Sequence, residues 1–148
     1  MATTIEFAST IKQAWTAVMA TANTASDGSG TIYTFQASSG GDYTAPAKGA
    51  RVERVTVINT QTTAGAAAAN KWALWVWDLS TSAWILYEEK LQAAATRSAT
   101  VLGQRQVFTY YQQNGLNLMS GQKLGMSIYV RASATDDCRA TAEIVEYT

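Results

Sequence analysis

The stretch that decides the fold is KWALWVWDLSTSAWILYEE, residues 71–89. Two runs of large apolar and aromatic residues, 71–78 and 83–89, flank the short polar turn at residues 79–82. Aromatic residues favour strands, and two such runs joined by a short turn are typical of a β-hairpin. The stretch therefore predicts two antiparallel strands in the middle of the chain.

Outside this hairpin, strand-like segments recur at short spacing between turn residues, as they do in sandwiches and barrels. The clearest is RVERVTVIN at residues 51–59, in which Val, Thr and Ile dominate. Residues 12–20 are expected to form a strand, although the overlapping span 11–21 also fits helical spacing. The other expected strands are residues 31–37, one or two strands within 99–111, a second hairpin made of 115–118 and 123–131, and a last strand at 139–147.

The expected strands number about eight, which fits a two-sheet jelly roll. We therefore predict an all-β fold, an antiparallel sandwich of about eight strands that is jelly-roll-like and carries a short N-terminal arm. Residues 1–12 are expected to form the arm, and residues 13–148 a single β-sandwich domain. The length agrees, because 148 residues is close to the commonest size of one domain.

Composition narrows the classes of function. Charged residues make up 15% of the chain, against roughly 25% in a typical domain, so a partner is expected to cover part of the surface. The 11 basic and 11 acidic residues balance and form no basic stripe, so we expect no nucleic acid partner. Neither a secretory signal nor a long apolar stretch is found, so no membrane partner is expected.

Candidate catalytic and metal-binding chemistry is sparse. The chain has no histidine, and so lacks the commonest general base and the commonest transition-metal ligand. Glu88 and Glu89 are neighbours in a predicted strand, so their side chains point to opposite faces and cannot act together. A calcium site at Asp27 would have one carboxylate and lacks the spacing of a calcium loop. We expect no catalytic residues, no metal and no cofactor, and therefore no enzyme.

The aromatic hairpin is the most informative feature for function, because strand alternation puts apolar side chains on both of its faces. One face of the first strand carries Trp72, Leu74 and Val76, and the other carries Ala73, Trp75 and Trp77. The second strand has Trp84, Leu86 and Glu88 on one face and Ile85 and Tyr87 on the other. A strand of a sandwich normally has one face packed in the core and one face exposed to solvent. Three interpretations stay open: a wholly buried hairpin, a subunit interface, or a carbohydrate-stacking platform with Trp75 or Trp77 exposed.

The predicted subunit interface combines one face of this hairpin with apolar residues of the arm. Trp and Tyr are enriched in the residues that dominate binding energy at interfaces. The arm is expected to extend across a neighbouring subunit and to become ordered on binding. The predicted interface residues are Trp75, Trp77, Tyr87, Ile85, Ile5 and Phe7.

Three stretches carry a resemblance to a known family: TANTASDGSGTIYTFQASSGGDYTAPAKGARVERVTV (residues 21–57), YEEKLQAAATRSATV (87–101) and GLNLMSGQKLGMSI (115–128). Their turns and strand edges are similar to those of small β-sandwich virion proteins of tailed bacteriophages. That family includes capsid decoration (cement) proteins and tail-associated proteins. The tryptophan-rich hairpin and the C-terminal residues VEYT depart from the family's pattern.

The resemblance implies a structural virion protein that is assembled in the host cytoplasm. The expected function is a capsid decoration (cement) subunit that binds the particle surface as a homo-oligomer. Its expected partners are itself and a major capsid or tail protein, with a glycan as a further candidate. The alternative is a carbohydrate-binding or host-attachment module of a phage tail or fibre.

Overall fold

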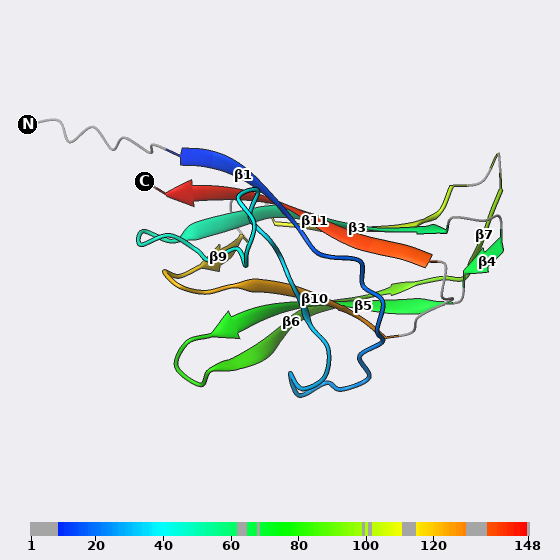
Figure 1. Ribbon diagram of the computed structural model, residues 1–148, viewed down its shortest axis with the longest axis horizontal. Coiled ribbons are helices and arrows are strands. Elements are labelled where there is room, and N and C mark those ends of the chain that lie inside the picture. The colour runs from blue at the N-terminus through cyan, green and yellow to red at the C-terminus, as the bar shows by residue number, and fades with distance from the viewer. Residues whose placement is uncertain are drawn as a thin grey trace, which may run out of the picture.

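The computed structural model describes residues 9–61, 65–67, 69–98, 100, 102–110, 115–129 and 136–147 (Figure 1). Every regular element within these ranges is a β-strand, which confirms the all-β prediction. Among the same residues, no helix is long and apolar enough to span a membrane. Residues 1–8 of the predicted arm lie outside the described residues, whereas residues 9–12 belong to the first strand rather than to the arm.

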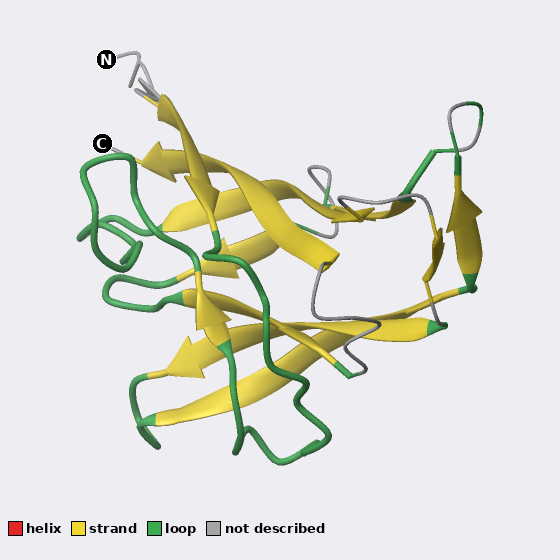
Figure 2. Ribbon diagram, turned by 45° about the vertical axis from the view of Figure 1, so that its right-hand side comes forward, coloured by secondary structure: helices red, strands yellow, loops and turns green. Residues whose placement is uncertain are grey.

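The strands form two facing antiparallel sheets and one small ribbon (Figure 1 and Figure 2). The five-stranded sheet contains β1 (Ser9–Trp15), β3 (Ala50–Gln61), β8 (Gln104–Thr109), β9 (Leu116–Leu118) and β11 (Asp136–Tyr147). The four-stranded sheet contains β2 (Tyr33–Thr34), β5 (Asn70–Asp78), β6 (Ala83–Gln92) and β10 (Leu124–Ile128). The ribbon consists of β4 (Gly65–Ala67) and β7 (Ala95–Arg97), and it lies at one end of the sandwich.

The order of the strands is that of a jelly roll. The five-stranded sheet runs β1-β11-β3-β8 with β9 also paired to β3, and the four-stranded sheet runs β2-β10-β5-β6. Because β8 and β9 pair with successive parts of β3, the nine strands of the two sheets fill eight positions. Numbered along the chain, positions 1 and 8, 2 and 7, 3 and 6, and 4 and 5 are paired, as in a long hairpin wrapped around a core. The prediction of a jelly-roll-like sandwich of about eight strands is confirmed.

The core lies between the two sheets, and the alternation of the strands supplies it. Two adjacent strands of the five-stranded sheet contribute fully buried residues, namely Val52, Val55 and Val57 from β3 and Ala140, Ala142 and Ile144 from β11. Strand β5 contributes Trp72 and Leu74 from the facing sheet. Each large side chain buried in this way stabilises the fold by about 1.5–3 kcal/mol.

One predicted hairpin is confirmed and the other is wrong. Strands β5 and β6 pair from Asn70 and Gln92 to Asp78 and Ala83, as the sequence predicted. Strands β9 and β10, predicted to form a hairpin, follow one another in the chain but pair in different sheets: β9 with β3, and β10 with β2 and β5. The turn between them carries the chain from one sheet to the other.

The strand predicted at residues 12–20 is confirmed in its first part only, and the helical alternative is wrong. Strand β1 ends at Trp15, and Thr16 and Met19 still donate backbone hydrogen bonds to β11. The chain then crosses the outer face of the four-stranded sheet as residues 20–32, which we call the covering loop (Figure 2). The backbone N–H of Asn23 donates a hydrogen bond to the carbonyl oxygen of Ile128 at 2.7 Å. The Tyr33 hydroxyl accepts two further backbone N–H bonds from the start of the loop.

Two glycines let the covering loop approach the sheet closely. Gly28 has a φ of 82°, and a Cβ atom there would overlap the backbone carbonyl oxygen of Trp84 in β6. At Gly125 in β10, a Cβ atom would lie 2.6 Å from the side chain of Ile32 and 2.9 Å from the Trp84 ring. Only glycine fits at either contact, so the sequence allows the loop to pack directly on the sheet.

Candidate functional site

The side chains of the aromatic hairpin are arranged differently from a simple alternation, because β6 contains a bulge. Leu74 pairs with Glu88, whereas the next residue, Trp75, pairs with Leu86, so Tyr87 has no partner in β5. Residues that lie directly opposite each other share a face of the sheet, and a bulge adds one unpaired residue. Leu86 and Glu88 therefore lie on opposite faces, and the prediction that they share a face is wrong.

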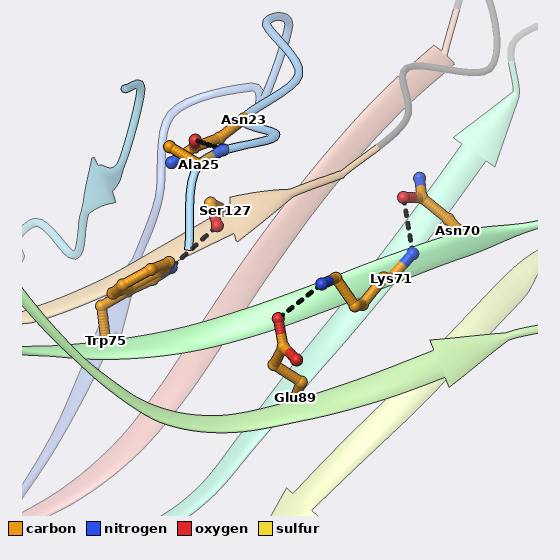
Figure 3. Close-up of polar contacts among 7 residues, drawn as sticks. All are labelled: Asn23, Ala25, Asn70, Lys71, Trp75, Glu89 and Ser127. Atoms are coloured by element: carbon orange, nitrogen blue, oxygen red, sulfur yellow. Dashed lines mark hydrogen bonds and ion pairs between the residues drawn. The ribbon is translucent and has the colours of Figure 1, made fainter. Parts of the chain in front are cut away.

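Trp75 lies on the outer face of the four-stranded sheet but is enclosed within the subunit. Its side chain is 2% exposed, and its indole Nε1–H donates a hydrogen bond to Ser127 Oγ at 2.7 Å (Figure 3). Asn23 and Ala25 of the covering loop lie over this site. The prediction of an exposed Trp75 is therefore wrong, because the loop covers the face that alternation alone would leave open.

Trp77, the second predicted platform residue, is half-buried at the far end of the same face. Its ring meets the ring of Trp84 edge to face, with centroids 5.4 Å apart and an angle of 73° between the planes. This geometry is the favoured one for aromatic pairs. Part of the Trp77 side chain stays accessible, and its role in an interface stays a prediction.

Ile85 and Tyr87 are 50% and 46% exposed on β6, the edge strand of the four-stranded sheet. The Tyr87 ring contacts the ring of Tyr110, with centroids 5.6 Å apart. The Tyr110 hydroxyl donates a hydrogen bond to the Glu88 carboxylate. Burial and this carboxylate raise the pKa of Tyr110 well above its ordinary value. The interface role of Ile85 and Tyr87 stays a prediction, and Ile5 and Phe7 lie outside the described residues.

A polar seam closes the sandwich where β6 faces β8. Lys90 Nζ donates a hydrogen bond to the carbonyl oxygen of Val107 at 2.8 Å and lies 5.0 Å from the centre of the Phe108 ring. Two glutamine side chains of β8 donate to backbone carbonyls at the end of the β6 segment: Gln106 to Leu91 at 2.9 Å, and Gln104 to Ala93 at 2.7 Å. These contacts occupy backbone groups that an edge strand would otherwise expose.

An apolar depression opens on the outer face, at the end of the hairpin nearest the ribbon. Tyr129 is 41% exposed there, and Lys71 Nζ lies 4.7 Å from the centre of its ring. Lys71 also forms an ion pair with Glu89 at 2.7 Å (Figure 3). The residues that line the depression are Ala69, Asn70, Lys71, Leu91, Gln92, Ala93 and Tyr129. No sequence pattern indicated this depression, because Tyr129 and Lys71 meet only when β10 pairs with β5.

The acidic residues considered as catalytic or metal-binding candidates have local structural partners. Glu89 pairs with Lys71 on the outer face, and Glu88 accepts a bond from the core residue Tyr110, so their predicted opposite orientation is confirmed. The carboxylate of Asp27 accepts hydrogen bonds from Ser29, which lower the pKa of Asp27. No group of three or more His, Cys, Asp or Glu side chains that could hold a metal occurs within the described ranges.

Asp78, at the tip of the aromatic hairpin, accepts hydrogen bonds from turn residues as Asp27 does. Its carboxylate accepts hydrogen bonds from the hydroxyls of Ser80 and Thr81, each at 2.6 Å, and from their backbone N–H groups. These bonds stabilise the charged form and lower the pKa of Asp78 to about 2. Asp78 therefore holds the shape of the turn that joins β5 to β6.

The strand order defines the chain as a jelly-roll β-sandwich protein. No family model matches the chain, and no curated protein matches it. Among solved structures, the chain is similar to the virus-like particle of the extra small virus of the giant freshwater prawn Macrobrachium rosenbergii. The two are 14% identical, with a TM-score of 0.35, over 100% of this chain and 84% of that chain. A similarity of this degree does not bear on function, and the fold assignment rests on the strand pairing alone.

Proposed function

We propose that this chain is a structural subunit of a virus particle, namely a capsid decoration (cement) subunit of a tailed phage that binds the particle surface as an oligomer. Jelly-roll sandwiches are used by viral capsid proteins, which supports the proposal. The same fold also serves unrelated functions, so further support for the proposal has to come from the exposed residues of this chain. The proposal includes no catalytic role, since the carboxylates described above cap turns or form local pairs.

The observation that carries the proposal is the set of exposed apolar side chains on the aromatic hairpin. Four residues form this set, which we call the exposed hairpin residues: Leu79 (50% exposed), Ile85 (50%), Tyr87 (46%) and Leu91 (78%). Two of them, Ile85 and Tyr87, were predicted from the sequence as interface residues. In a chain with only 15% charged residues, such side chains are natural contacts for another protein.

The exposed hairpin residues lie on both faces of the hairpin, and the magnitudes indicate that they alone would bind weakly. Full burial of a large apolar side chain is worth about 1.5–3 kcal/mol, so covering these partly exposed residues gives about 1–2 kcal/mol each. Association itself costs about 4–15 kcal/mol, which offsets most or all of that gain. A subunit that uses this surface needs either a second contact or several copies bound together, which is how a decoration protein would act on a repetitive shell.

The proposal can be tested by co-sedimentation of the purified chain with phage particles that lack it. Ile85→Lys places a charge in the proposed contact, and Thr24→Lys places the same charge on an exposed position of the covering loop as a control. We expect wild type and Thr24→Lys to sediment with the particles and Ile85→Lys to lose most of its binding while keeping its melting temperature. Equal binding by all three proteins, or binding by none, would overturn the proposal.

A second candidate function, glycan binding by a tail or fibre module, is favoured by the depression at Tyr129. An exposed aromatic ring with Lys71, Asn70 and Gln92 on its rim offers both a stacking surface and hydrogen-bonding groups. This candidate predicts binding on a glycan array that is lost in Tyr129→Ala and kept in Trp77→Ala. If no glycan on a broad array is bound, the glycan-binding function is excluded, and the proposal of a structural subunit is unaffected.

A further inference from the structure

The sandwich has four sheet edges, and three of them are blocked against pairing with another strand. The β2 edge is two residues long. The edge formed by β8 and β9 is divided between two short strands. The β6 edge carries the bulge at Tyr87, the charged residues Glu88 and Lys90 directed at the seam, and backbone carbonyls occupied by glutamines. Short edges, bulges and inward charges are the devices by which proteins prevent edge pairing.

The fourth edge, β1, is regular and has no bulge, and its one charged side chain, Lys12, is exposed. Its seven residues pair with β11 in an uninterrupted register from Ser9 with Tyr147 to Trp15 with Thr141. The N–H and C=O of Trp15 both bond to Gln36, on the side away from β11. Backbone groups alternate in direction along an antiparallel strand. The odd-numbered residues Ser9, Ile11 and Gln13 therefore also direct their backbone groups outward.

A cleft of about 350 Å³ lies beside this edge. Lys12 and Gln13 of β1 line one side of it, and residues of the segment that follows β2, together with Glu146 of β11, line the rest. The polar residues of that segment are Ser38, Ser39, Asp42 and Thr44. Ile11, which precedes Lys12 on the outward-facing side of the strand, is 75% exposed. The edge is thus exposed and regular, and a cleft lined by both polar and apolar residues borders it.

We propose that β1 pairs antiparallel with β1 of a second copy of this chain, about a twofold axis at Ile11. The partner of stated chemistry is a strand with the sequence STIKQ, residues 9–13 of the other copy. This inference rests on the proposed function, because it supplies the second contact that the exposed hairpin residues need. It leaves the hairpin free to contact the particle.

Charge selects this register. With Ile11 opposite its own copy, Lys12 lies opposite Thr10 of the other subunit, whereas an axis at Lys12 would put two lysines directly opposite each other, which is destabilising. Thr10 is paired on its other side with Glu146. The Cα atoms of Lys12 and of Glu146 in the other copy are then two strand spacings, or about 10 Å, apart. The two long side chains can span this distance and form an ion pair. The interaction occurs twice, as twofold symmetry requires.

The pairing joins the two five-stranded sheets into one continuous sheet across the dimer. Ser9, Ile11 and Gln13 would form three hydrogen-bonded pairs with Gln13, Ile11 and Ser9 of the other copy. The Thr10 side chain lies on the same face as Lys12 and Glu146, which line the cleft, and Ile11 loses much of its exposure at the axis. A backbone interface of this kind is strand addition, in which main-chain bonds provide affinity and side chains fix the register.

The test is a thiol crosslinking experiment on the full-length chain. Ile11→Cys places two thiols across the axis, where Cα atoms of a hydrogen-bonded pair are about 5.5 Å apart. Asn117→Cys puts an exposed thiol on β9, at the opposite edge of the same sheet, as the matched control. The native Cys138 is 3% exposed and provides the wild-type background. With a short crosslinker, we expect covalent dimers of Ile11→Cys several-fold above those of Asn117→Cys and wild type.

A second variant separates this inference from the proposed function. Ile11→Lys should convert oligomers to monomers in sedimentation velocity without changing the melting temperature, because the side chain is exposed in the single subunit. If the wild type associates but neither the crosslinking nor Ile11→Lys follows this pattern, the β1 inference is overturned and the proposed function stands. If the wild type stays monomeric at every concentration and does not bind particles, both are overturned.

Discussion

Replacing Gly28 by alanine tests whether the covering loop seals the outer face of the four-stranded sheet. Gly28 has a φ of 82°, a conformation that costs other residues about 1–2 kcal/mol. The added Cβ would also overlap the carbonyl oxygen of Trp84, so the loop would have to move away from β6. That movement would admit water to Trp75 and its bond with Ser127.

Gly40→Ala is the matched control for this substitution. Gly40 also has a φ of 82°, but a Cβ atom there would meet nothing within 4 Å. We expect Gly40→Ala to lower the free energy of unfolding only by the cost of placing alanine at a positive φ, about 1–2 kcal/mol. Gly28→Ala should lose about 1–3 kcal/mol more, the cost of disturbing a buried hydrogen bond. For a chain of this length, each kcal/mol corresponds to about 2–4 °C in melting temperature.

Thermal and urea unfolding followed by circular dichroism would measure both losses, and tryptophan emission would report on the loop. We expect the emission of Gly28→Ala to shift to longer wavelength while that of Gly40→Ala stays unchanged. Equal destabilisation by the two variants, together with unchanged emission in both, would show that the loop is not packed against β6.

Three further predictions follow from the buried and turn contacts. Trp75→Phe and Ser127→Ala should each destabilise the fold by about 1–3 kcal/mol, and the double variant by less than their sum; additive losses would show that the two side chains are not bonded. The folded pKa of Asp78, about 2, lies below the ordinary 3.8, so its charged form stabilises the fold above about pH 4, and this contribution is lost as the pH falls towards 2. Urea midpoints of Asp78→Ala should therefore depend less on pH in that window, and parallel profiles for variant and wild type would contradict this. The raised pKa of Tyr110 means that it ionises later than an ordinary tyrosine, so its contribution to stability is present below pH 10 and lost as the pH rises through the folded pKa. An absorbance titration should show one fewer late-ionising tyrosine in Tyr110→Phe. In Glu88→Gln, Tyr110 should ionise at a lower pH than in the wild type. An unchanged titration in both variants would contradict this prediction.

The sequence predicted the features of the fold that depend on local pattern. The hairpin at residues 71–89 and the strand at 51–59 were predicted because their composition favours strands, and a short polar turn separates the two runs of the hairpin. The second hairpin prediction failed because a short turn between two strands gives no information about which sheet each strand joins. Strands β9 and β10 sit on either side of such a turn in different sheets.

The site could be predicted only in part, because two tertiary features changed which side chains are exposed. The bulge at Tyr87 alters the alternation of β6, and no residue type marks it in advance. The covering loop buries Trp75, and the pattern of β5 itself does not show that a segment distant in sequence lies over its outer face. Ile85 and Tyr87 were predicted as interface residues because alternation gives the hairpin two apolar faces, and the structure shows both side chains exposed on the edge strand β6.

Cryo-electron microscopy of phage particles saturated with the purified chain would show whether this chain decorates the particle. We expect ordered jelly-roll density on the particle surface, with Ile85 and Tyr87 buried against the shell. A reconstruction at saturating concentration that shows a bare surface, or one in which these two residues face solvent, would contradict this prediction.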